Sequence, residues 1–184
     1  MILKPSENSY YVIPDKFLAG EYPRDIDEES SIRKIKSLIT AGVRTFIDLT
    51  TKNDKLKPYD YLLKPYSSLN IQHFNFPIPD FSVPSSENQT IEILDTIEKY
   101  IETGTIVYLH CWGGVGRTGV IAGCWLAEHG YPGEAALSRL RDLWKECAKS
   151  NGRKSPETKE QEEYIINWLK HKQEILQKVT VIIA

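Results

Sequence analysis

The sequence has few of the features that mark secreted and membrane proteins. It contains three cysteines in 184 residues, too few for a disulfide framework, and the odd number suits a reducing cytoplasm. No apolar run approaches the roughly 20 residues of a membrane helix, and residues 1–6 lack the apolar core of a secretory signal. These absences predict a cytoplasmic protein.

The sequence also lacks a large excess of either charge sign. Lysine and arginine total 23, aspartate and glutamate total 25, and the net charge is −2. Without a basic field, the chain is not expected to bind nucleic acid, and without an apolar span it is not expected to enter a membrane. There is no internal repeat or low-complexity segment, and the length suffices for one core. We therefore expect residues 1–184 to form a single domain and a monomer.

Short apolar runs alternate with helical patterns along the chain. The runs at 45–49, 71–76 and 105–109 are typical of buried strands, and those at 10–13 and 17–19 of a small hairpin. Helical patterns are expected at 28–41, 58–67, 85–103, 119–127, 133–148 and 155–173. This alternation predicts an α/β fold, a three-layer sandwich whose mainly parallel central sheet is flanked by helices.

The most informative segment, residues 108–119, reads Tyr-Leu-His-Cys-Trp-Gly-Gly-Val-Gly-Arg-Thr-Gly. It joins a predicted strand to a predicted buried helix, and backbone N–H groups of such a glycine-rich loop can surround an oxyanion. Arg117 adds a planar fork suited to two phosphate oxygens. Cys111 lies at the base of this positive loop, where a thiolate is favoured. A thiolate beneath a bound phosphate is a nucleophile directed at phosphorus.

Two other interpretations of this segment exist. A structural glycine-rich turn with a buried cysteine would also show a cysteine and an arginine six positions apart. A Walker phosphate loop fits poorly, because the sequence has no Gly-Lys-Ser/Thr. With His110 before it and Thr118-Gly119 after it, the segment resembles the signature loop of cysteine-dependent protein phosphatases, which include protein-tyrosine and atypical dual-specificity enzymes.

The resemblance covers most of the chain, but it is specific only at 110–119, around 80 and around 155–161. It implies a reaction that needs no cofactor and no metal. It also implies that Thr118 hydrogen-bonds the thiolate and that His110 supports the loop. The groups implied to bind the substrate phosphate are Trp112, Gly113, Gly114, Val115, Gly116 and Arg117.

Asp80 is the predicted general acid. It is the only carboxylate in the proline-rich segment 76–84 and lies 31 positions before Cys111. In the resembling family a mobile loop at this place carries the acid, which protonates an otherwise poor leaving group. The alternative is an aspartate that caps a turn. Asp54 and Asp60 are weaker candidates, since neither follows a strand into a proline-framed loop.

The segment 155–161 resembles the place where many family members carry a glutamine that orients the hydrolytic water. We assign that role to Gln161; the alternative is an exposed helical glutamine. Ser155 and Pro156 are expected to be the N-cap and first residue of the last helix. The apolar end, residues 179–184, would dock on the core or meet a partner.

The sequence leaves the roles of Tyr22, Arg24 and Trp112 open. Tyr22 and Arg24 would either border the active site or be ordinary loop residues. The ring of Trp112 would lie either at the mouth of the pocket or in the core beneath the loop.

The resemblance implies a phosphoprotein phosphatase that hydrolyses phosphotyrosine through a phosphocysteine intermediate. Phosphoserine and phosphothreonine remain open, because the tyrosine-recognition loop of large tyrosine phosphatases is not evident. One alternative is a phosphoinositide, inositol phosphate or RNA 5′-triphosphate phosphatase on the same fold; the uncharged residues 112–115 favour a phosphoprotein instead. The other is a non-catalytic phosphate-binding adaptor, against which the joint presence of Cys111, Arg117 and Asp80 argues.

Overall fold

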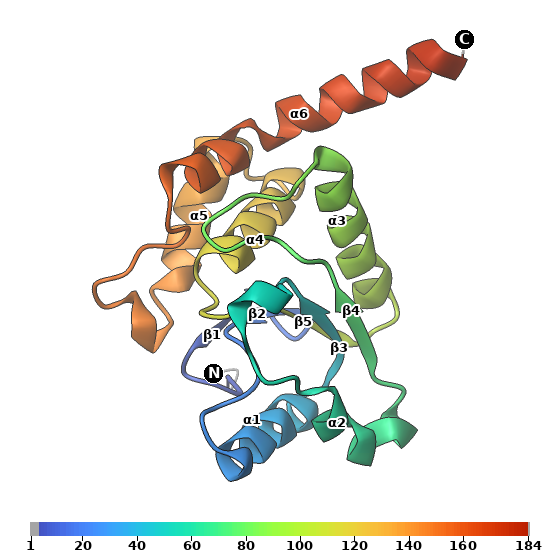
Figure 1. Cartoon of the computed structure of the whole chain (residues 1–184). Coiled ribbons are helices and arrows are strands. Elements are labelled where there is room, and N and C mark those ends of the chain that lie inside the picture. Colours follow the sequence, from blue (N-terminus) through green and yellow to red (C-terminus); the bar gives the residue numbers. More distant parts are fainter. Residues whose placement is uncertain (1–3, 184) are drawn as a thin grey trace.

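The computed structural model describes residues 4–183, with side chains described through residue 177. Within this part of the chain, the centre is a five-stranded sheet in the order β1-β2-β5-β3-β4 (Figure 1). The strands are β1 (Ser9–Ile13), β2 (Phe17–Gly20), β3 (Val43–Asp48), β4 (Gln72–Asn75) and β5 (Ile106–His110). The pair β1–β2 is antiparallel, and every other neighbouring pair is parallel. Both the mainly parallel sheet and the hairpin are confirmed.

Helices cover both faces of the sheet. In Figure 1, α1 and α2 lie on one side of the sheet and the remaining helices on the other. Tyr108 and Leu109 of β5 point to opposite faces, as strand geometry requires, and belong to two separate apolar clusters. The three-layer sandwich is therefore confirmed. The helices are α1 (Glu28–Thr40), α2 (Asp60–Leu63), α3 (Glu87–Glu102), α4 (Gly116–Glu128), α5 (Glu134–Trp144) and α6 (Lys159–Ile183), with 3₁₀ turns η1 (Lys52–Asp54), η2 (Lys64–Leu69) and η3 (Ala148–Ser150).

The two elements that flank the loop, β5 and α4, are deeply buried. Every residue of β5 is buried, and so is every residue of α4 before its last. A helix that is apolar on most sides must be covered on most sides, which α4 achieves by packing against α3, α5 and α6. The loop between β5 and α4 therefore lies at the carboxyl end of a central parallel strand, where open α/β sheets bind ligands.

The start of the last helix differs from the expectation. Helix α6 begins at Lys159, and the hydroxyl of Thr158 accepts the backbone N–H of Gln161 at 3.2 Å. The predicted N-cap Ser155 is instead fully buried, and its hydroxyl donates to the carbonyl oxygen of Val115 at 2.8 Å. A buried carbonyl needs a donor, so Ser155 supports the loop before α4 rather than capping α6.

The last helix also continues to Ile183 instead of ending at 173. The helices expected at 58–67 and 133–148 were wrong in their bounds as well. The expected helix 58–67 is divided into α2 and η2, with Pro65 in the first turn of η2, where proline lacks the N–H that a continuing helix requires. The expected helix 133–148 ends at Trp144. Side chains of the apolar end, 179–184, lie outside the described residues. None of the described helices combines the length and apolar composition needed to cross a membrane.

Candidate active site

The loop from Cys111 to Val115 lies between two buried elements. Cys111 is itself buried at the end of β5. Val115 occupies the N-cap position of α4, and no side chain caps the helix there. The first N–H groups of a helix have no partner within the helix, so at this N-terminus they are available to an anion.

Gly114 allows the loop to lie against the neighbouring strand. Its φ of 74° is left-handed, and a Cβ atom there would lie 2.5 Å from the carbonyl carbon of Gly20 at the end of β2. A side chain at this position would therefore meet both backbone strain and a direct clash. Next to this contact, the N–H of Tyr22 donates to the carbonyl oxygen of Trp112 at 2.9 Å. The loop is thus fixed to the segment that follows β2.

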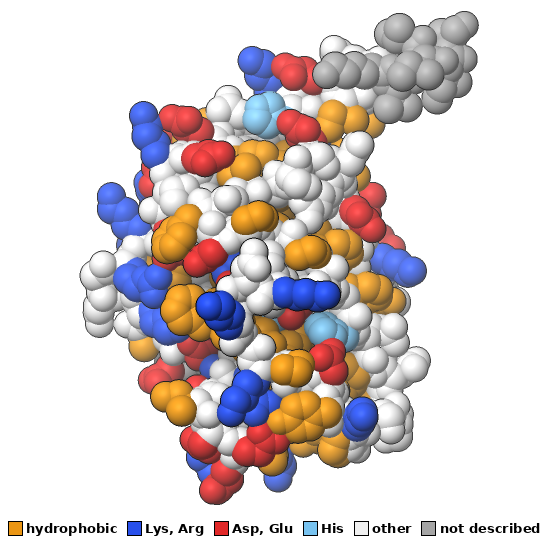
Figure 2. Space-filling view, viewed as in Figure 1, with side chains coloured by type: hydrophobic (Ala, Val, Ile, Leu, Met, Phe, Trp, Pro, Cys, Tyr) orange, Lys and Arg blue, Asp and Glu red, His pale blue; other side chains and the backbone are white. Residues whose placement is uncertain are grey.

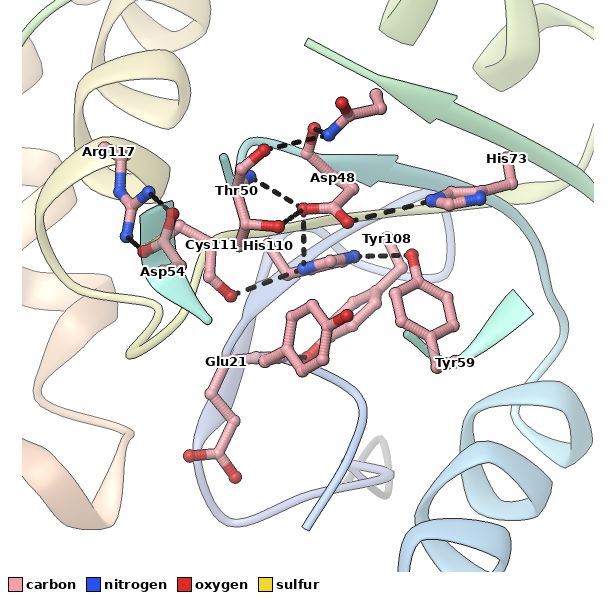
Figure 3. Close-up of polar contacts among 12 residues, drawn as sticks. Glu21, Asp48, Thr50, Asp54, Tyr59, His73, Tyr108, His110, Cys111 and Arg117 are labelled. Carbon is pink, nitrogen blue, oxygen red and sulfur yellow. Dashed lines mark hydrogen bonds and ion pairs between the residues drawn. The ribbon is translucent and has the colours of Figure 1, made fainter. Parts of the chain in front are cut away.

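Arg117 is held by two carboxylates. Its Nη1 and Nη2 atoms contact the two carboxylate oxygens of Asp54 at 3.0 and 2.7 Å (Figure 3). Nη2 also lies 3.0 Å from Oδ1 of Asp80. The Nε atom is buried and has no hydrogen-bond partner among the described residues. The terminal edge of the guanidinium is therefore used to orient it, and the Nε side is the part that remains for a bound anion.

Asp54 is a site residue that the sequence suggested only as an alternative acid. It follows β3 in the turn η1, where its Oδ2 accepts the N–H of Thr51 at 2.7 Å in a capping box. Burial opposes its ionised form, but hydrogen bonds from Arg117 and from Thr51 outweigh burial and hold the pKa of Asp54 below its usual value. The capping-box spacing Thr51-x-x-Asp54 was visible in the sequence, whereas the pairing with Arg117, 63 positions away, was not.

Asp80 has the placement expected of a group that meets substrate. Its side chain is 40% exposed, against 5% for Asp54, yet it reaches Arg117. The third candidate, Asp60, points elsewhere and pairs with Nδ1 of His73 at 2.5 Å. Of the three aspartates considered as the acid, Asp80 alone is both exposed and next to Arg117.

Gln161 is fully buried, so it is not the exposed helical glutamine of the alternative interpretation. Its Oε1 accepts the N–H groups of Glu157 and Thr158, and its Nε2 donates to the carbonyl oxygen of Ser82 at 2.9 Å. A Cβ atom at Gly116 would lie 3.0 Å from Nε2. Gln161 therefore connects α6 to the loop that carries Asp80, directly beneath the start of α4. Its assignment to the hydrolytic water remains a prediction.

His110 supports the loop from behind as a neutral imidazole. Its Nδ1 lies 3.3 Å from the carbonyl oxygen of Cys111 and 3.8 Å from the carboxylate of Asp48, and both of these are acceptors. Nε2 is 2.8 Å from the hydroxyl of Tyr59 (Figure 3). We therefore place the proton on Nδ1. Burial, only partly offset by Asp48, lowers the pKa of His110 to about 4.

Thr118 lies in the buried part of the site and Trp112 in its exposed part. Thr118 is fully buried, and its hydroxyl has no hydrogen-bond partner among the described residues. Trp112 is 60% exposed, which places its ring at the mouth of the site and not in the core. Tyr22 and Arg24, whose roles were left open, line a cavity beside Trp112 and so border the site.

The remaining cysteines play no part in this arrangement. Cys124 and Cys147 are buried and unpaired, and burial raises the pKa of each thiol. Cys124 is thus the core residue that its helix predicted. Among the described residues, no group of three or more His, Cys, Asp or Glu side chains could hold a metal ion.

Comparison with known proteins identifies the family. Residues 24–131, more than half of the chain, match the family described as "Polymorphic toxin system, DSP-PTPase phosphatase". The chain belongs to this family of DSP-PTPase phosphatases. The matched region includes Asp54, Asp80, Cys111 and Arg117, and it excludes Gln161.

Individual relatives agree with the family. Protein 067L of Invertebrate iridescent virus 3, which carries a tyrosine phosphatase name, is 31% identical over 120 residues, covering 64% of this chain and 45% of the viral protein. The chain spans about half the length of the curated relatives it matches.

Solved structures show the same fold. The active form of Tk-PTP superimposes with a TM-score of 0.65 at 24% identity, covering 91% of this chain and 97% of the other. PTPMT1 in complex with PI(5)P superimposes with a TM-score of 0.66 at 15% identity, covering 93% and 99% of the two chains. At these identities the likeness establishes the protein-tyrosine-phosphatase fold and no finer property.

The buried His110 predicts a stability that falls in acid. The pKa of His110 is depressed in the folded state. Its contribution to the free energy of unfolding is therefore complete above the pKa of about 6.5 in the unfolded chain, and it is lost as pH falls toward 4. By pH 4 the loss from this group reaches about 3 kcal/mol. Urea unfolding at pH 7 and pH 4 should therefore show a smaller acid loss in His110→Asn than in the wild type.

His73 provides a matched control of opposite sign. Burial opposes its protonation, but Asp48 and Asp60 outweigh burial and raise the pKa of His73. The contribution of His73 to the free energy of unfolding is complete below its pKa in the unfolded state. It is lost as pH rises through its pKa in the folded state. His73→Asn should therefore show a larger acid loss than the wild type. Equal acid losses in all three proteins would contradict a neutral His110.

The pairing of Arg117 with Asp54 predicts a role in anion binding for Asp54, a residue outside the loop. Asp54→Asn keeps the shape but removes the charge that orients the guanidinium. Affinity for inorganic phosphate, measured by calorimetry, should fall about 10- to 100-fold, the usual effect of weakening a hydrogen bond to a charged group. Unchanged affinity in a folded variant would show that Arg117 needs no such partner.

Proposed function

We propose that this chain is a phosphoprotein phosphatase that hydrolyses phosphotyrosine, and also phosphoserine or phosphothreonine, through a phosphocysteine intermediate. The observation that carries the proposal is the convergence of Cys111, Arg117 and Asp80. Cys111 begins the loop, Arg117 lies in the first turn of α4 that ends it, and Asp80, from a separate segment, lies 3.0 Å from Arg117. Membership of the DSP-PTPase family supports the same chemistry.

The first displacement breaks the bond between phosphorus and the leaving oxygen. The N–H groups of residues 112–117 and the Nε side of Arg117 hold the phosphoryl oxygens and stabilise their charge in the transition state. The Cys111 thiolate attacks phosphorus in line, while the Asp80 carboxyl group gives its proton to the departing oxygen. The products of this step are the dephosphorylated alcohol or phenol and a phosphocysteine.

The second displacement restores the enzyme. The Asp80 carboxylate accepts a proton from water, the water oxygen attacks phosphorus, and the bond to Cys111 breaks. The departing thiolate accepts a hydrogen bond from the buried hydroxyl of Thr118. We propose that Gln161 places the water, since its side chain lies beneath Gly116 and contacts the Asp80 loop.

The contact between Asp80 and Arg117 connects substrate binding to acid catalysis. Nη2 of Arg117 carries two hydrogens, and one is donated to Asp54. Asp80 pairs with Nη2 only as an ion pair, so a phosphoryl oxygen that accepts the other hydrogen displaces Asp80 from the guanidinium. Substrate binding thereby frees the Asp80 carboxyl group for the leaving oxygen.

The wider assignments belong to the same proposal. We propose a cytoplasmic monomer in which residues 1–184 form one catalytic domain, with a phosphorylated protein or peptide as its substrate and no nucleic acid or membrane as partner. A phosphoinositide is the competing substrate, because PTPMT1 shares the fold. The uncharged loop residues 112–115 favour a protein substrate, since highly charged substrates call for cations in the loop. Turnover of phosphopeptides against phosphoinositides tests this choice.

Cys111→Ser tests the nucleophile. Hydrolysis of aryl phosphates should fall by more than about 10³-fold, as happens when a covalent nucleophile is removed. Binding of inorganic phosphate, followed by calorimetry, should persist because the loop amides and Arg117 remain. Loss of binding together with activity would indicate a collapsed loop, and turnover near wild type would remove Cys111 from the mechanism.

Asp80→Asn tests the general acid. Single-turnover rates on phosphotyrosine and alkyl phosphates should fall by about 10²- to 10⁴-fold, the usual effect of positioned proton transfer. An aryl ester whose leaving group departs as a stable anion should lose less, because it needs no proton. Asp60→Asn, which alters the partner of His73, is the matched control and should show no such dependence on leaving group. An equal loss on all esters for Asp80→Asn would place the acid elsewhere.

A further inference from the structure

A cationic cavity lies beside the catalytic loop. It has a volume of about 410 Å³ and includes Trp112 and Gly113 in its wall. Six lysine and arginine side chains and two carboxylates line it, although the chain as a whole carries a net charge of −2. A second cavity, of about 290 Å³, lies on the side of Asp54 and Asp80 and shares Trp112 with the first. The exposed tryptophan thus stands between the acid and a separate cationic site.

Four of the six cations in this wall already have carboxylate partners. Lys34 and Lys149 both contact Glu21, Arg24 pairs with Glu28 at 2.6 Å, and Arg153 pairs with Glu157 at 2.5 Å. These pairs neutralise much of the wall.

Lys55 and Lys57 are the exceptions. Both are exposed, and neither forms an ion pair with any described residue, although the charge of Lys57 helps to lower the pKa of Glu28. Lys55 directly follows Asp54, which holds Arg117, and Lys57 lies two residues further along the chain. Figure 2 shows lysine and arginine side chains gathered over this part of the molecule, near η1.

The segment that carries these two lysines is fixed to the catalytic loop. The hydroxyl of Tyr22 donates to the carbonyl oxygen of Lys57 at 3.1 Å, and the N–H of Tyr22 donates to Trp112. Arg24 donates to the carbonyl oxygen of Pro58 at 3.1 Å. One residue, Tyr22, therefore links the cationic rim to the phosphate-binding loop. The backbone that carries Lys55 and Lys57 is therefore fixed relative to the phosphate-binding loop.

We propose that this cavity binds a second anionic side chain of a protein substrate, an acidic or phosphorylated residue next to the residue whose phosphate enters the loop. The inference rests on the proposed function and specifies its substrate class. Lys55 and Lys57 supply the positive charge that is not held in an ion pair with any described residue, and the exposed ring of Trp112 supports the peptide between the two sites. A peptide is favoured over an inositol headgroup because the loop itself carries no lysine.

The test compares two substrates on each variant. One phosphotyrosine peptide has neutral neighbours, and the other has an aspartate or a phosphoserine beside the phosphotyrosine. The measured quantity is the ratio of their kcat/KM values, so any general loss of activity cancels. The variants are the double substitution Lys55→Gln with Lys57→Gln, and the matched control Lys52→Gln, an exposed lysine of η1 outside the cavity wall.

The wild type and Lys52→Gln should prefer the acidic peptide by about 3- to 10-fold, as two exposed charge pairs can supply, and the double variant should lose this preference. The wild-type preference should also shrink as salt is raised. No preference in a wild type that hydrolyses the neutral peptide would overturn the inference and leave the proposed function intact. An effect of the double variant confined to phosphoinositide vesicles would assign the cavity to a lipid and overturn it too. Failure on both peptides would instead reject the proposed function.

Discussion

The buried ion pair between Arg117 and Asp54 is the contact on which the candidate site depends. A guanidinium that is 1% exposed would be costly without a counter-charge, and Asp54 supplies one through two parallel hydrogen bonds. Because those bonds use the terminal nitrogens, the Nε side is directed away from Asp54. The same pair brings the turn after β3 to the loop after β5, and the Asp80 loop joins them through Arg117. One side chain thus assembles three segments.

The loop itself is held by contacts that leave its own N–H groups free. Ser155 donates to the carbonyl oxygen of Val115, Tyr22 to that of Trp112, and neutral His110 faces that of Cys111. All three contacts are made to carbonyl oxygens. When the carbonyl of a peptide unit is anchored on one side, its N–H points to the other, so these contacts favour an anion-binding loop. A positive charge on His110 is not required for this, and burial lowers the pKa of His110 enough to keep the ring neutral despite the nearby Asp48.

The cations around the site fall into two groups, those paired with carboxylates and those without an ion pair. Cations that pair with nearby carboxylates, such as Lys34 and Arg153, stabilise the wall of the cavity beside Trp112. Lys55 and Lys57 do not pair with any described residue, and they lie at the end of the η1 turn that Asp54 anchors. The turn therefore presents a buried negative charge to the arginine and exposed positive charges to solvent. These two functions come from four consecutive residues.

The sequence by itself determined the local features. The β5–loop–α4 segment could be recognised because its strand, glycines, cysteine and arginine are contiguous, and a buried helix is apolar on most sides. The alternation of strands and helices likewise determined the layered fold, since each element carries its own pattern. Asp80 could be proposed because the proline-rich segment around it contains no other carboxylate.

Only the tertiary structure decided which distant groups meet. Asp54 and Arg117 are 63 positions apart, and nothing in the pattern around Asp54 distinguishes a partner of arginine from a residue that caps a turn. Ser155 matched an N-cap in sequence, but its hydroxyl was needed by a buried carbonyl of a different segment. Gln161 and Trp112 could each have been exposed or buried by their local patterns. Such contacts depend on how parallel strands bring their carboxyl ends together, and this is a property of the packed chain that no short stretch of sequence encodes.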